Sequence, residues 1–449
     1  MSYAPIPRGS VIGILGNGHF GRLLAQAARE MGYRAWILGP GINSPAGQVA
    51  DREFDADYLD LTAIEEFAKG SDVITFGCHR IPAKCLEFLG PLKTVRPSPE
   101  TLLLMGNRLR ERTWLQERGF PLPDFVSVRS RAELDDAIDL IGSPSILRSY
   151  RPDQDIKRCR KISAGDDLDE SWAAMEGEDA ILETWVQCEQ VLSVACARSV
   201  GGETRCFPVC EITYHEDILV AANAPAAIPA DIAQKAQAMA LQIAQSARTI
   251  GILTVQLSVL PDGGLLVDEL TPTPHASGQF SMDACSSSQF QHHILAITGR
   301  PLPKIDLKEP ATTITMLGAL WRQDPAPFDA LRALPHAHLH LYGKADPSPR
   351  REMGHITVLG ELTPDICESL RRLALDQTFQ PPKPPSPADI VVGRLEQRPF
   401  SPFAVILANG LPLAVDEPAA LARLRGSFVH QSKEGAVTQF NPDDISAVS

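Results

Sequence analysis

Apolar residues in the first third of the chain change repeatedly between a strand spacing and a helix spacing. Short apolar runs alternate with helical patterns at residues 11–15, 22–31, 35–38, 63–69 and 73–76. This alternation is typical of parallel strands joined by helical crossovers, because such strands are buried on both faces and read as continuous apolar runs. The pattern predicts an α/β domain with a parallel sheet. A longer amphipathic stretch at residues 99–118 predicts one helix that closes the domain.

From about residue 121 the pattern becomes that of antiparallel strands mixed with helices. Strands are expected within residues 153–162, 192–222, 253–260 and 265–270, and helices at residues 132–141 and 231–250. The turn residues Pro261-Asp-Gly-Gly264 join the last two strands into a hairpin. Further strands are expected at residues 312–317, 336–342 and 355–359, and then a helix at residues 364–375 with Thr363 as its N-cap. We therefore expect this part of the chain to be α+β.

Composition and charge narrow the class of protein. The 449 residues include 42 Lys and Arg against 55 Asp and Glu, a net charge of −13, and 44% of them are hydrophobic. These values are typical of a soluble globular protein, and the acidity argues against a nucleic-acid or anionic-membrane partner. The nine cysteines form no C-x-x-C pair, and no apolar run reaches the length of a membrane span. We expect a cytoplasmic protein with reduced thiols.

A glycine loop follows the first predicted strand. Gly16, Gly18 and Gly21 form a G-x-G-x-x-G pattern that opens a helix, where backbone N–H groups can bind a phosphate. The second strand ends at Gly39, so the acidic residue that holds the ribose of NAD is missing. A phosphate-bearing substrate therefore fits better than a dinucleotide. The alternative is a tight turn without a ligand.

Four stretches of sequence carry a resemblance to a known family. They are VIGILGNGHFGRLLAQAAREMGYRAWIL from residue 11, SPAGQVAD at 44–51, GILTVQLSVLPDGGLLVDELTPTPHASGQFSMDACSSSQFQHHILAITGRPLP at 251–303 and LHLYGKADPSPRREMGHITVLG at 339–360. Together they resemble the ATP-grasp ligases of purine synthesis, and more closely the 5-(carboxyamino)imidazole ribonucleotide synthases. The resemblance implies ATP and Mg²⁺ as cofactors, the carboxylation of 5-aminoimidazole ribonucleotide with bicarbonate through carboxyphosphate, and a homodimer.

The resemblance also implies a domain layout. We expect an N-terminal α/β (pre-ATP-grasp) domain at residues 1–119 that binds the substrate phosphate, an ATP-grasp domain at 120–305 and a small C-terminal domain at 306–378. A proline-rich linker at residues 379–388 follows, because its PPKPPSP run cannot enter a core. The role of the extension at residues 389–449 stays open.

Matching positions give the site residues that the resemblance implies. The expected nucleotide-binding residues are Arg108, Arg148, Glu183, Thr184, Trp185, Val186, Asp268 and Glu269, of which Asp268 and Glu269 also bind Mg²⁺. Glu183 and Val186, in the stretch ILETWV, occupy the position of the family's adenine hinge. The expected substrate-binding residues are Gly16, Gly18, Gly21, Lys344 and Arg351, and the two basic ones are also the catalytic candidates.

Other positions depart from the family pattern. The loop that covers the phosphates has lost its glycines at residues 153–159, and Val191 replaces a glutamate that would hold the ATP ribose. Gln256 replaces a magnesium carboxylate and weakens that site, since a neutral amide is a poorer ligand for a hard cation. Arg148 replaces a lysine and keeps its charge, and Asp268 replaces an asparagine and remains an oxygen ligand. The remaining departures are Gly77-Cys-His-Arg80, Thr273, Ala276, Gln279 and Glu352. These changes predict an eroded nucleotide site, and they leave two alternatives: a ligase of doubtful activity, or a non-catalytic paralogue with a binding or regulatory role.

Two charged patterns lie outside these motifs. Residues 148–161 carry six cationic and two anionic side chains, and they either bind an anion or acidic partner or form an ordinary solvated hairpin. His336, His338 and His340 alternate, so in a strand their imidazoles share one face. They could ligate a transition metal, but an ordinary strand is the favoured interpretation, because no carboxylate or cysteine lies next to them in the sequence.

Overall fold

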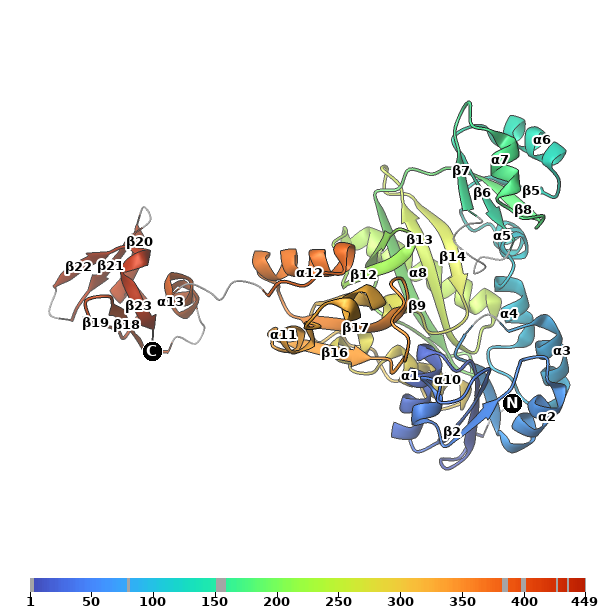
Figure 1. The fold of residues 1–449 in the computed structure, drawn as a ribbon, viewed down its shortest axis with the longest axis horizontal. Helices are drawn as coiled ribbons and strands as arrows, with labels where there is room; N and C mark the ends of the chain where they lie inside the picture. Colours follow the sequence, from blue (N-terminus) through green and yellow to red (C-terminus); the bar gives the residue numbers. More distant parts are fainter. Residues whose placement is uncertain are drawn as a thin grey trace. The chain divides into compact units, whose positions relative to one another are not determined.

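The computed structural model describes residues 4–78, 81–150, 159–381, 387–396, 401–424, 427–433 and 436–448 (Figure 1). Two compact units make up the chain, Met1–Gln380 and Pro381–Ser449. Most of the basic segment, residues 151–158, lies outside the described residues, as do His79, Arg80 and residues 382–386 of the expected linker. The expected α/β and α+β class is confirmed.

The N-terminal sheet is parallel, as its apolar runs predict. Its strand order is β3-β2-β1-β4, built from β1 (Val11–Leu15), β2 (Arg34–Gly39), β3 (Arg52–Asp55) and β4 (Val73–Phe76). The helices of this domain are α1 (His19–Glu30), α2 (Leu61–Gly70) and α3 (Ala83–Leu92). All residues of β1 and β4 are buried. Strand β3 escapes the sequence pattern because REFD is short and mostly charged.

The expected single helix at residues 99–118 is wrong. The segment forms two helices, α4 (Pro99–Met105) and α5 (Arg108–Gln116). Gly106 ends the first, and Asn107, in an extended conformation, accepts a hydrogen bond from the Arg110 N–H as N-cap of the second. The break gives α5 its own first turn, and this turn carries the charged residues of the site described below.

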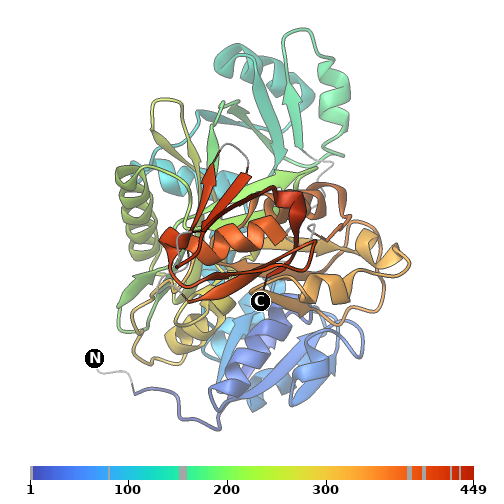
Figure 2. The ribbon, with the colours of Figure 1, turned by 90° about the vertical axis from the view of Figure 1, so that its left-hand side faces the viewer.

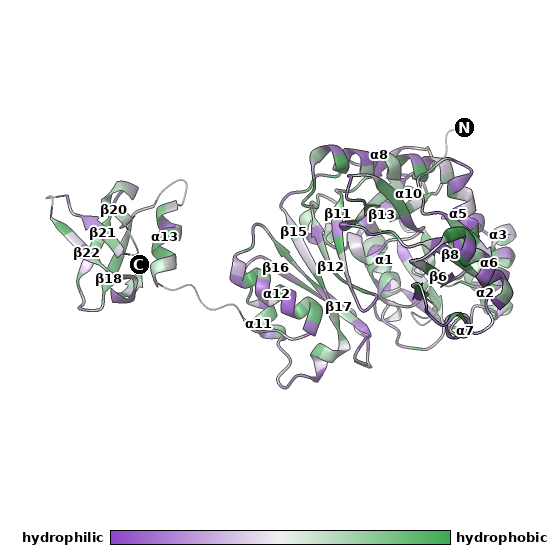
Figure 3. Cartoon of the chain, turned by 90° about the horizontal axis from the view of Figure 1, so that it is seen from above, coloured by the Kyte–Doolittle hydropathy of each residue, from purple (hydrophilic) through white to green (hydrophobic). Residues whose placement is uncertain are grey.

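Two antiparallel sheets follow. The smaller has the order β5-β8-β6-β7, from β5 (Phe125–Val128), β6 (Ser145–Ser149), β7 (Cys159–Ile162) and β8 (Ala180–Thr184), with α6 (Arg131–Ile141) and α7 (Leu168–Ala173). Its strand β8 is drawn largely in hydrophobic green in Figure 3, in agreement with its buried residues. In Figure 2 this sheet, in teal, and the blue N-terminal sheet lie on opposite sides of the larger sheet.

The larger sheet joins the central and C-terminal segments of the main unit. Its order is β14-β13-β9-β11-β12-β15-β17-β16, and β10 pairs with β9. The strands are β9 (Gln190–Arg198), β10 (Thr204–Cys206), β11 (Cys210–His215), β12 (Ile218–Ala224), β13 (Gly251–Val259), β14 (Leu265–Thr271), β15 (Ala311–Leu317), β16 (Ala337–Leu341) and β17 (Glu352–Leu359). The helices are α8 (Ala230–Ala247), α9 (Ser281–Ala284), α10 (Gln289–Ile297), α11 (Phe328–Arg332) and α12 (Pro364–Asp376). The predicted hairpin of β13 and β14 is confirmed, and so is Thr363 as N-cap of α12.

The second unit has its own hydrophobic core. It contains α13 (Pro387–Glu396), a sheet of β18 (Phe403–Leu407), β19 (Pro412–Val415) and β23 (Ile445–Val448), and a sheet of β20 (Leu421–Leu424), β21 (Ser427–Gln431) and β22 (Val437–Phe440). Val391, Phe403 and Phe428 are among its buried residues. Among the helices that the structure describes in either unit, none has the length and apolar character to cross a bilayer.

Candidate functional site

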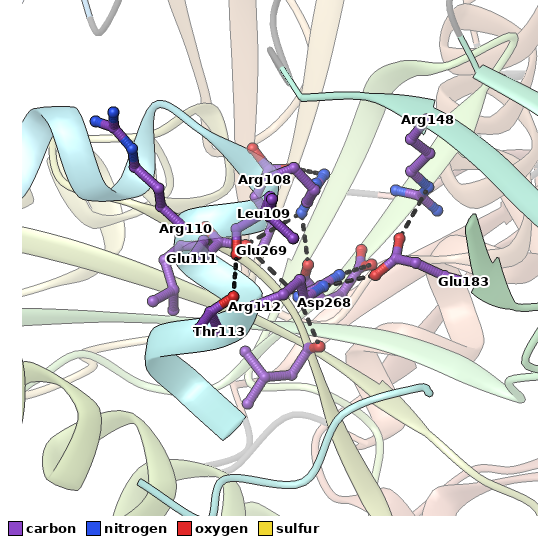
Figure 4. Close-up of polar contacts among 12 residues, drawn as sticks. Arg108, Leu109, Arg110, Glu111, Arg112, Thr113, Arg148, Glu183, Asp268 and Glu269 are labelled. Carbon is purple, nitrogen blue, oxygen red and sulfur yellow. Dashed lines mark hydrogen bonds and ion pairs between the residues drawn. The ribbon is translucent and has the colours of Figure 1, made fainter. Parts of the chain in front are cut away.

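The first turns of α5 place three charged side chains in the interior. Arg108, Glu111 and Arg112 stand at i, i+3 and i+4 and therefore share one helix face. Their exposed fractions are only 4%, 2% and 1%. Buried charged side chains require ion-pair or hydrogen-bond partners, which surrounding elements must supply. Figure 4 shows these partners, which come from β6, β8 and β14.

Glu183 of β8 lies between two arginines. Its Oε1 accepts a hydrogen bond of 2.6 Å from Arg112 Nε, and its Oε2 is 3.6 Å from Arg148 Nε. Burial favours the neutral acid, but Arg112, Arg148 and Arg108 outweigh burial and hold the pKa of Glu183 below its usual value. The carboxylate expected at the adenine hinge is thus engaged with the arginines of the interior.

The rest of the expected hinge continues from the end of β8. The Thr184 and Trp185 N–H groups donate to the Asp124 and Pro144 carbonyls at 2.9 and 3.1 Å. The Trp185 side chain is exposed, and the Lys161 ammonium lies 4.1 Å from the centre of its ring. An aromatic face beside a cation is a combination that suits a purine and its phosphates.

Arg108 and Glu111 anchor β14. Arg108 Nη1 donates to the Asp268 carbonyl at 2.8 Å, and Glu111 Oε2 accepts from the Leu270 N–H at 3.1 Å. Burial alone would lower the pKa of Arg108, but the carboxylates around it, Glu111 first, raise that pKa. For Glu111 burial prevails over Arg108 and raises its pKa to about 7.

A β-bulge explains how two consecutive carboxylates reach the same arginines. Gln256 pairs with Glu269 and Leu257 pairs with Val267, so Asp268 is the extra residue. Such a bulge re-aims a side chain that would otherwise point to the opposite face. Asp268 Oδ1 lies 3.9 Å from Arg112 Nη2, and Glu269 Oε2 lies 3.8 Å from Arg108 Nη2. Their side chains stay 31% and 32% exposed, so both carboxylates are open to a ligand on their outer side.

Gln256 occupies the position opposite Glu269. Its side chain is buried, and its Oε1 accepts a hydrogen bond of 2.9 Å from the Tyr214 hydroxyl. Burial, and then Glu269 and Asp268, raise the pKa of Tyr214, so this hydroxyl keeps its proton. The neutral amide is therefore held in place by a neutral donor, next to the two open carboxylates.

The glycine loop forms an uncapped helix start. Gly16 has φ of +112°, and a Cβ on Gly21 would lie 2.0 Å from the Gly16 carbonyl oxygen, so both positions require glycine. Gly18 is the N-cap of α1, without a side-chain cap, and a Cβ there would meet no atom within 4 Å. The helix start therefore has no side-chain cap and has room beside Gly18, as a phosphate site requires.

The predicted lysine lies near this helix start. The His19 ring of α1 stacks on Tyr342 at 4.4 Å, and Lys344 Nζ lies 5.6 Å from the centre of the Tyr342 ring. Burial lowers the pKa of Lys344 to about 8, although Glu352 opposes the shift. Burial, and then the Lys344 charge, hold the pKa of His19 well below its usual value. His19 Nε2 lies 3.2 Å from Glu352 Oε2, so the Glu352 carboxylate contacts α1.

Arg351 has a different partner from the other predicted basic residue. Its Nη1 donates to the Asp346 carbonyl at 3.1 Å, and the side chain is 41% exposed.

The structure brings the predicted site residues together in two groups. One contains Arg108, Arg148, Glu183, Asp268 and Glu269, and the other contains Lys344 and the Gly18 helix start. We refer to these groups as the carboxylate cluster, which also includes Glu111 and Arg112, and the helix-start cluster.

Sequence reasoning missed four residues of these clusters. Arg112 and Glu111 carry the buried ion pairs, Tyr214 fixes Gln256, and His19 joins α1 to β16 and β17. The charged i, i+3, i+4 spacing in NRLRERTW was a signal for the first two. Tyr214 contacts Gln256 across the larger sheet, and His19 contacts residues of another domain. No local sequence pattern predicts either contact.

Comparison with known proteins places the chain among relatives. Residues 10–105 match the family model of the ribonucleotide synthetase preATP-grasp domain, residues 113–290 that of the ATP-grasp domain and residues 311–368 that of the phosphoribosylaminoimidazole carboxylase C-terminal domain. The N5-carboxyaminoimidazole ribonucleotide synthase of Bacillus subtilis is 36% identical over 362 residues, which cover 80% of this chain and 94% of that protein. The chain belongs to the N5-carboxyaminoimidazole ribonucleotide synthase family.

Solved structures of this synthase family agree with the fold. An ADP complex of an N5-carboxyaminoimidazole ribonucleotide synthetase has 35% identity and a TM-score of 0.78, and covers 82% of this chain and 97% of its own. The Aspergillus clavatus synthase, solved with ADP and 5-aminoimidazole ribonucleotide, has 25% identity and a TM-score of 0.74 over 81% of this chain and 97% of its own. The three-domain layout of the main unit is therefore that of the synthases.

Proposed function

We propose that this protein uses ATP and bicarbonate to carboxylate 5-aminoimidazole ribonucleotide, as its family membership suggests. One observation carries the proposal furthest. The bulge at Asp268 turns two partly open carboxylates to the same side, and buried arginines hold them from behind. Carboxylate oxygens are the ligands that Mg²⁺ prefers, and a nucleotide triphosphate is bound through such ions.

The residues of the carboxylate cluster would have different roles at the phosphates of ATP. Asp268 and Glu269 would hold Mg²⁺, which when bound neutralises charge on the transferring phosphoryl group. Their side chains have an open side, whereas Glu111 and Glu183 are 2% exposed and engaged with arginines. The last two are therefore positioning residues, which fix Arg108 and Arg112. Arg148 is 28% exposed and provides a cation at the edge of the cluster.

The helix-start cluster would bind the ribonucleotide phosphate. The first N–H groups of α1, which have no side-chain cap, and the positive end of the α1 dipole favour an anion. Lys344 adds a charge that burial destabilises, and a bound phosphate would offset that cost. One site for Mg²⁺ with its nucleotide and one site for a phosphate match a reaction between two phosphorylated molecules, ATP and the ribonucleotide.

The test is ADP release from ATP and bicarbonate, with and without 5-aminoimidazole ribonucleotide. We expect release that the ribonucleotide stimulates and that Glu269→Gln reduces by at least about a hundredfold, since this change removes transition-state stabilisation of about 3 kcal/mol. Glu117→Gln, an exposed residue just after α5, is the matched control and should leave the rate unchanged. Ribonucleotide-independent release, or equal rates for both variants, would contradict the proposal.

A second candidate function is nucleotide binding without turnover. It is favoured by Gln256, because this neutral side chain lies opposite Glu269 and is hydrogen-bonded to Tyr214. An amide fixed in this way gives Mg²⁺ a weaker ligand than a carboxylate. Retained ATP binding in a calorimetric titration, with no ribonucleotide-stimulated ADP release, would support this second candidate against the first.

A further inference from the structure

A cluster of metal-ligating side chains lies outside the two clusters described so far. Asp283 of α9, His340 of β16 and His355 of β17 each offer one ligand atom, and these atoms all lie within 4.8 Å of one another. The sequence contains the histidines of β16 but no neighbouring carboxylate. The fold supplies that carboxylate from α9, more than fifty residues away along the chain.

The distances are near those of a coordination sphere. His340 Nε2 lies 3.0 and 3.2 Å from the two Asp283 carboxylate oxygens. Ligand atoms at ~2.0–2.1 Å from a tetrahedral ion are about 3.3 Å apart. His340 and Asp283 therefore already stand at ligand spacing, and His355 needs to approach by at most about 1.5 Å from its 4.8 Å limit.

The buried histidine has a ring nitrogen without a partner. His355 is 0% exposed, and within the described part of the chain its Nε2 makes no hydrogen bond. A buried polar atom left unpaired is costly, and such an orphan calls for an unseen ligand. Its ring stacks on that of His340, with the ring centres 4.5 Å apart.

The other nitrogen of His355 has the hydrogen bond that metal ligands require. His355 Nδ1 lies 2.8 Å from the Tyr342 hydroxyl oxygen, which also accepts from Gln279 Nε2 at 2.7 Å. That oxygen has two lone pairs and can accept from both groups. The Nδ1–H tautomer leaves the Nε2 lone pair free for an ion, and an outer hydrogen bond of this kind orients a histidine ligand.

We propose that Asp283, His340 and His355 bind one divalent transition-metal ion of the Zn²⁺ class. Two imidazoles and one carboxylate suit such an ion and discriminate against Mg²⁺, which demands oxygen ligands. His338, with Nδ1 3.6 Å from Asp283 Oδ1, is the fourth candidate ligand at the exposed rim. The ion would join α9, after the β14 loop, to β16 and β17. It is thus independent of the Mg²⁺ expected at Asp268 and Glu269.

The test is metal binding by the untagged full chain after chelator treatment. Zn²⁺ is titrated against a chromophoric chelator, and Co²⁺ is added in a parallel sample for its visible absorption. We expect one equivalent of Zn²⁺ bound with Mg²⁺ in excess, and a Co²⁺ spectrum without thiolate charge-transfer bands. Exposed thiols at Cys159, Cys188 and Cys367 are alkylated beforehand to remove competing sulfur ligands.

Variants locate the ion. Asp283→Asn and His340→Gln should each weaken Zn²⁺ binding more than about tenfold, the scale on which even outer partners act. His336→Gln is the matched control, because this exposed histidine precedes β16 and makes no contact with Asp283 among the described residues. Circular dichroism of the metal-free variants checks folding, and Tyr342→Phe provides a further variant that keeps all the proposed ligands but removes the hydroxyl contacts to His355 Nδ1 and Gln279 Nε2. No stoichiometric Zn²⁺, thiolate bands, or equal affinity in the folded variants and wild type would each overturn the proposal.

Discussion

Replacing Arg112 tests whether the buried ion pairs hold the carboxylate cluster together. The side chain is 1% exposed, its Nε donates to Glu183 at 2.6 Å, and its Nη1 lies 3.5 Å from Glu111 Oε1. Arg112→Met keeps most of the side-chain volume and removes the charge. Glu183, itself 2% exposed, is then left with Arg148 at 3.6 Å.

The expected loss of stability follows from this geometry. At an effective dielectric constant of about 20, unit charges ~4 Å apart interact by about 4 kcal/mol. Removing one partner of a buried pair costs ~3–5 kcal/mol, because the other charge stays uncompensated. We therefore expect Arg112→Met to lower the free energy of unfolding of the main unit by ~3–5 kcal/mol. The matched control Arg110→Met, on the exposed side of the same helix (Figure 4), should change it by less than about 0.5 kcal/mol.

The assay is urea unfolding followed by circular dichroism, in a double-mutant cycle with Glu183→Gln. The double variant has no orphaned charge, so its cost should fall short of the sum of the single costs by up to ~3 kcal/mol. A loss below about 1 kcal/mol for Arg112→Met, or strictly additive costs, would refute the reasoning. In that case water or a local rearrangement stabilises the Glu183 charge, and Arg112 is not needed to keep the carboxylate cluster in place.

Three further predictions concern the ligand sites. Gln256→Glu should increase the Mg²⁺-dependent affinity for ATP severalfold in calorimetry, because it adds a carboxylate opposite Asp268 and Glu269. Unchanged affinity would show that the side chain at position 256 does not reach the Mg²⁺ ion. The kcat/KM for the ribonucleotide should fall as pH rises through about 8, the pKa of Lys344. In the Lys344→Arg variant this fall should be absent. An equal fall in the variant and the wild type would assign the titration to another group. Gly21→Ala should destabilise the chain by ~1–3 kcal/mol in thermal unfolding, because its Cβ would lie 2.0 Å from the Gly16 oxygen. Gly18→Ala, which meets no atom within 4 Å, should not destabilise it, and equal losses would contradict the steric argument.

Local periodicity predicted much of the fold, because strands buried on both faces and capped helices have strong local signals. It failed where two residues interrupt an amphipathic pattern. Gly106 and Asn107 divide the expected helix, although the apolar spacing continues across them. It also failed at β3, whose REFD sequence is strand only because β2 offers a free parallel edge.

The site was predictable only through the resemblance, and then only in part. Arg108 and Glu269 are motif positions, but nothing local shows that Asp268 is a bulge residue, since this depends on the register of β14 against β13. Likewise the alternation of His338 and His340 predicts a shared face, and both do approach Asp283. The carboxylate itself comes from a distant helix, so the sequence pattern alone favoured an ordinary strand.

The charge balance of the carboxylate cluster explains how an acidic protein can bind phosphates. Its cations are Arg108, Arg112 and Arg148, and its carboxylates are Glu111, Glu183, Asp268 and Glu269. Three against four gives −1, or zero when Glu111, with a pKa of about 7, is protonated. Such a cluster does not attract a free polyphosphate, since every arginine is already matched by a carboxylate. In the proposed function it attracts a divalent cation, and the nucleotide follows as the counter-charge of that cation. On this reasoning the side chain at position 256 has more influence on ATP binding than any of the arginines.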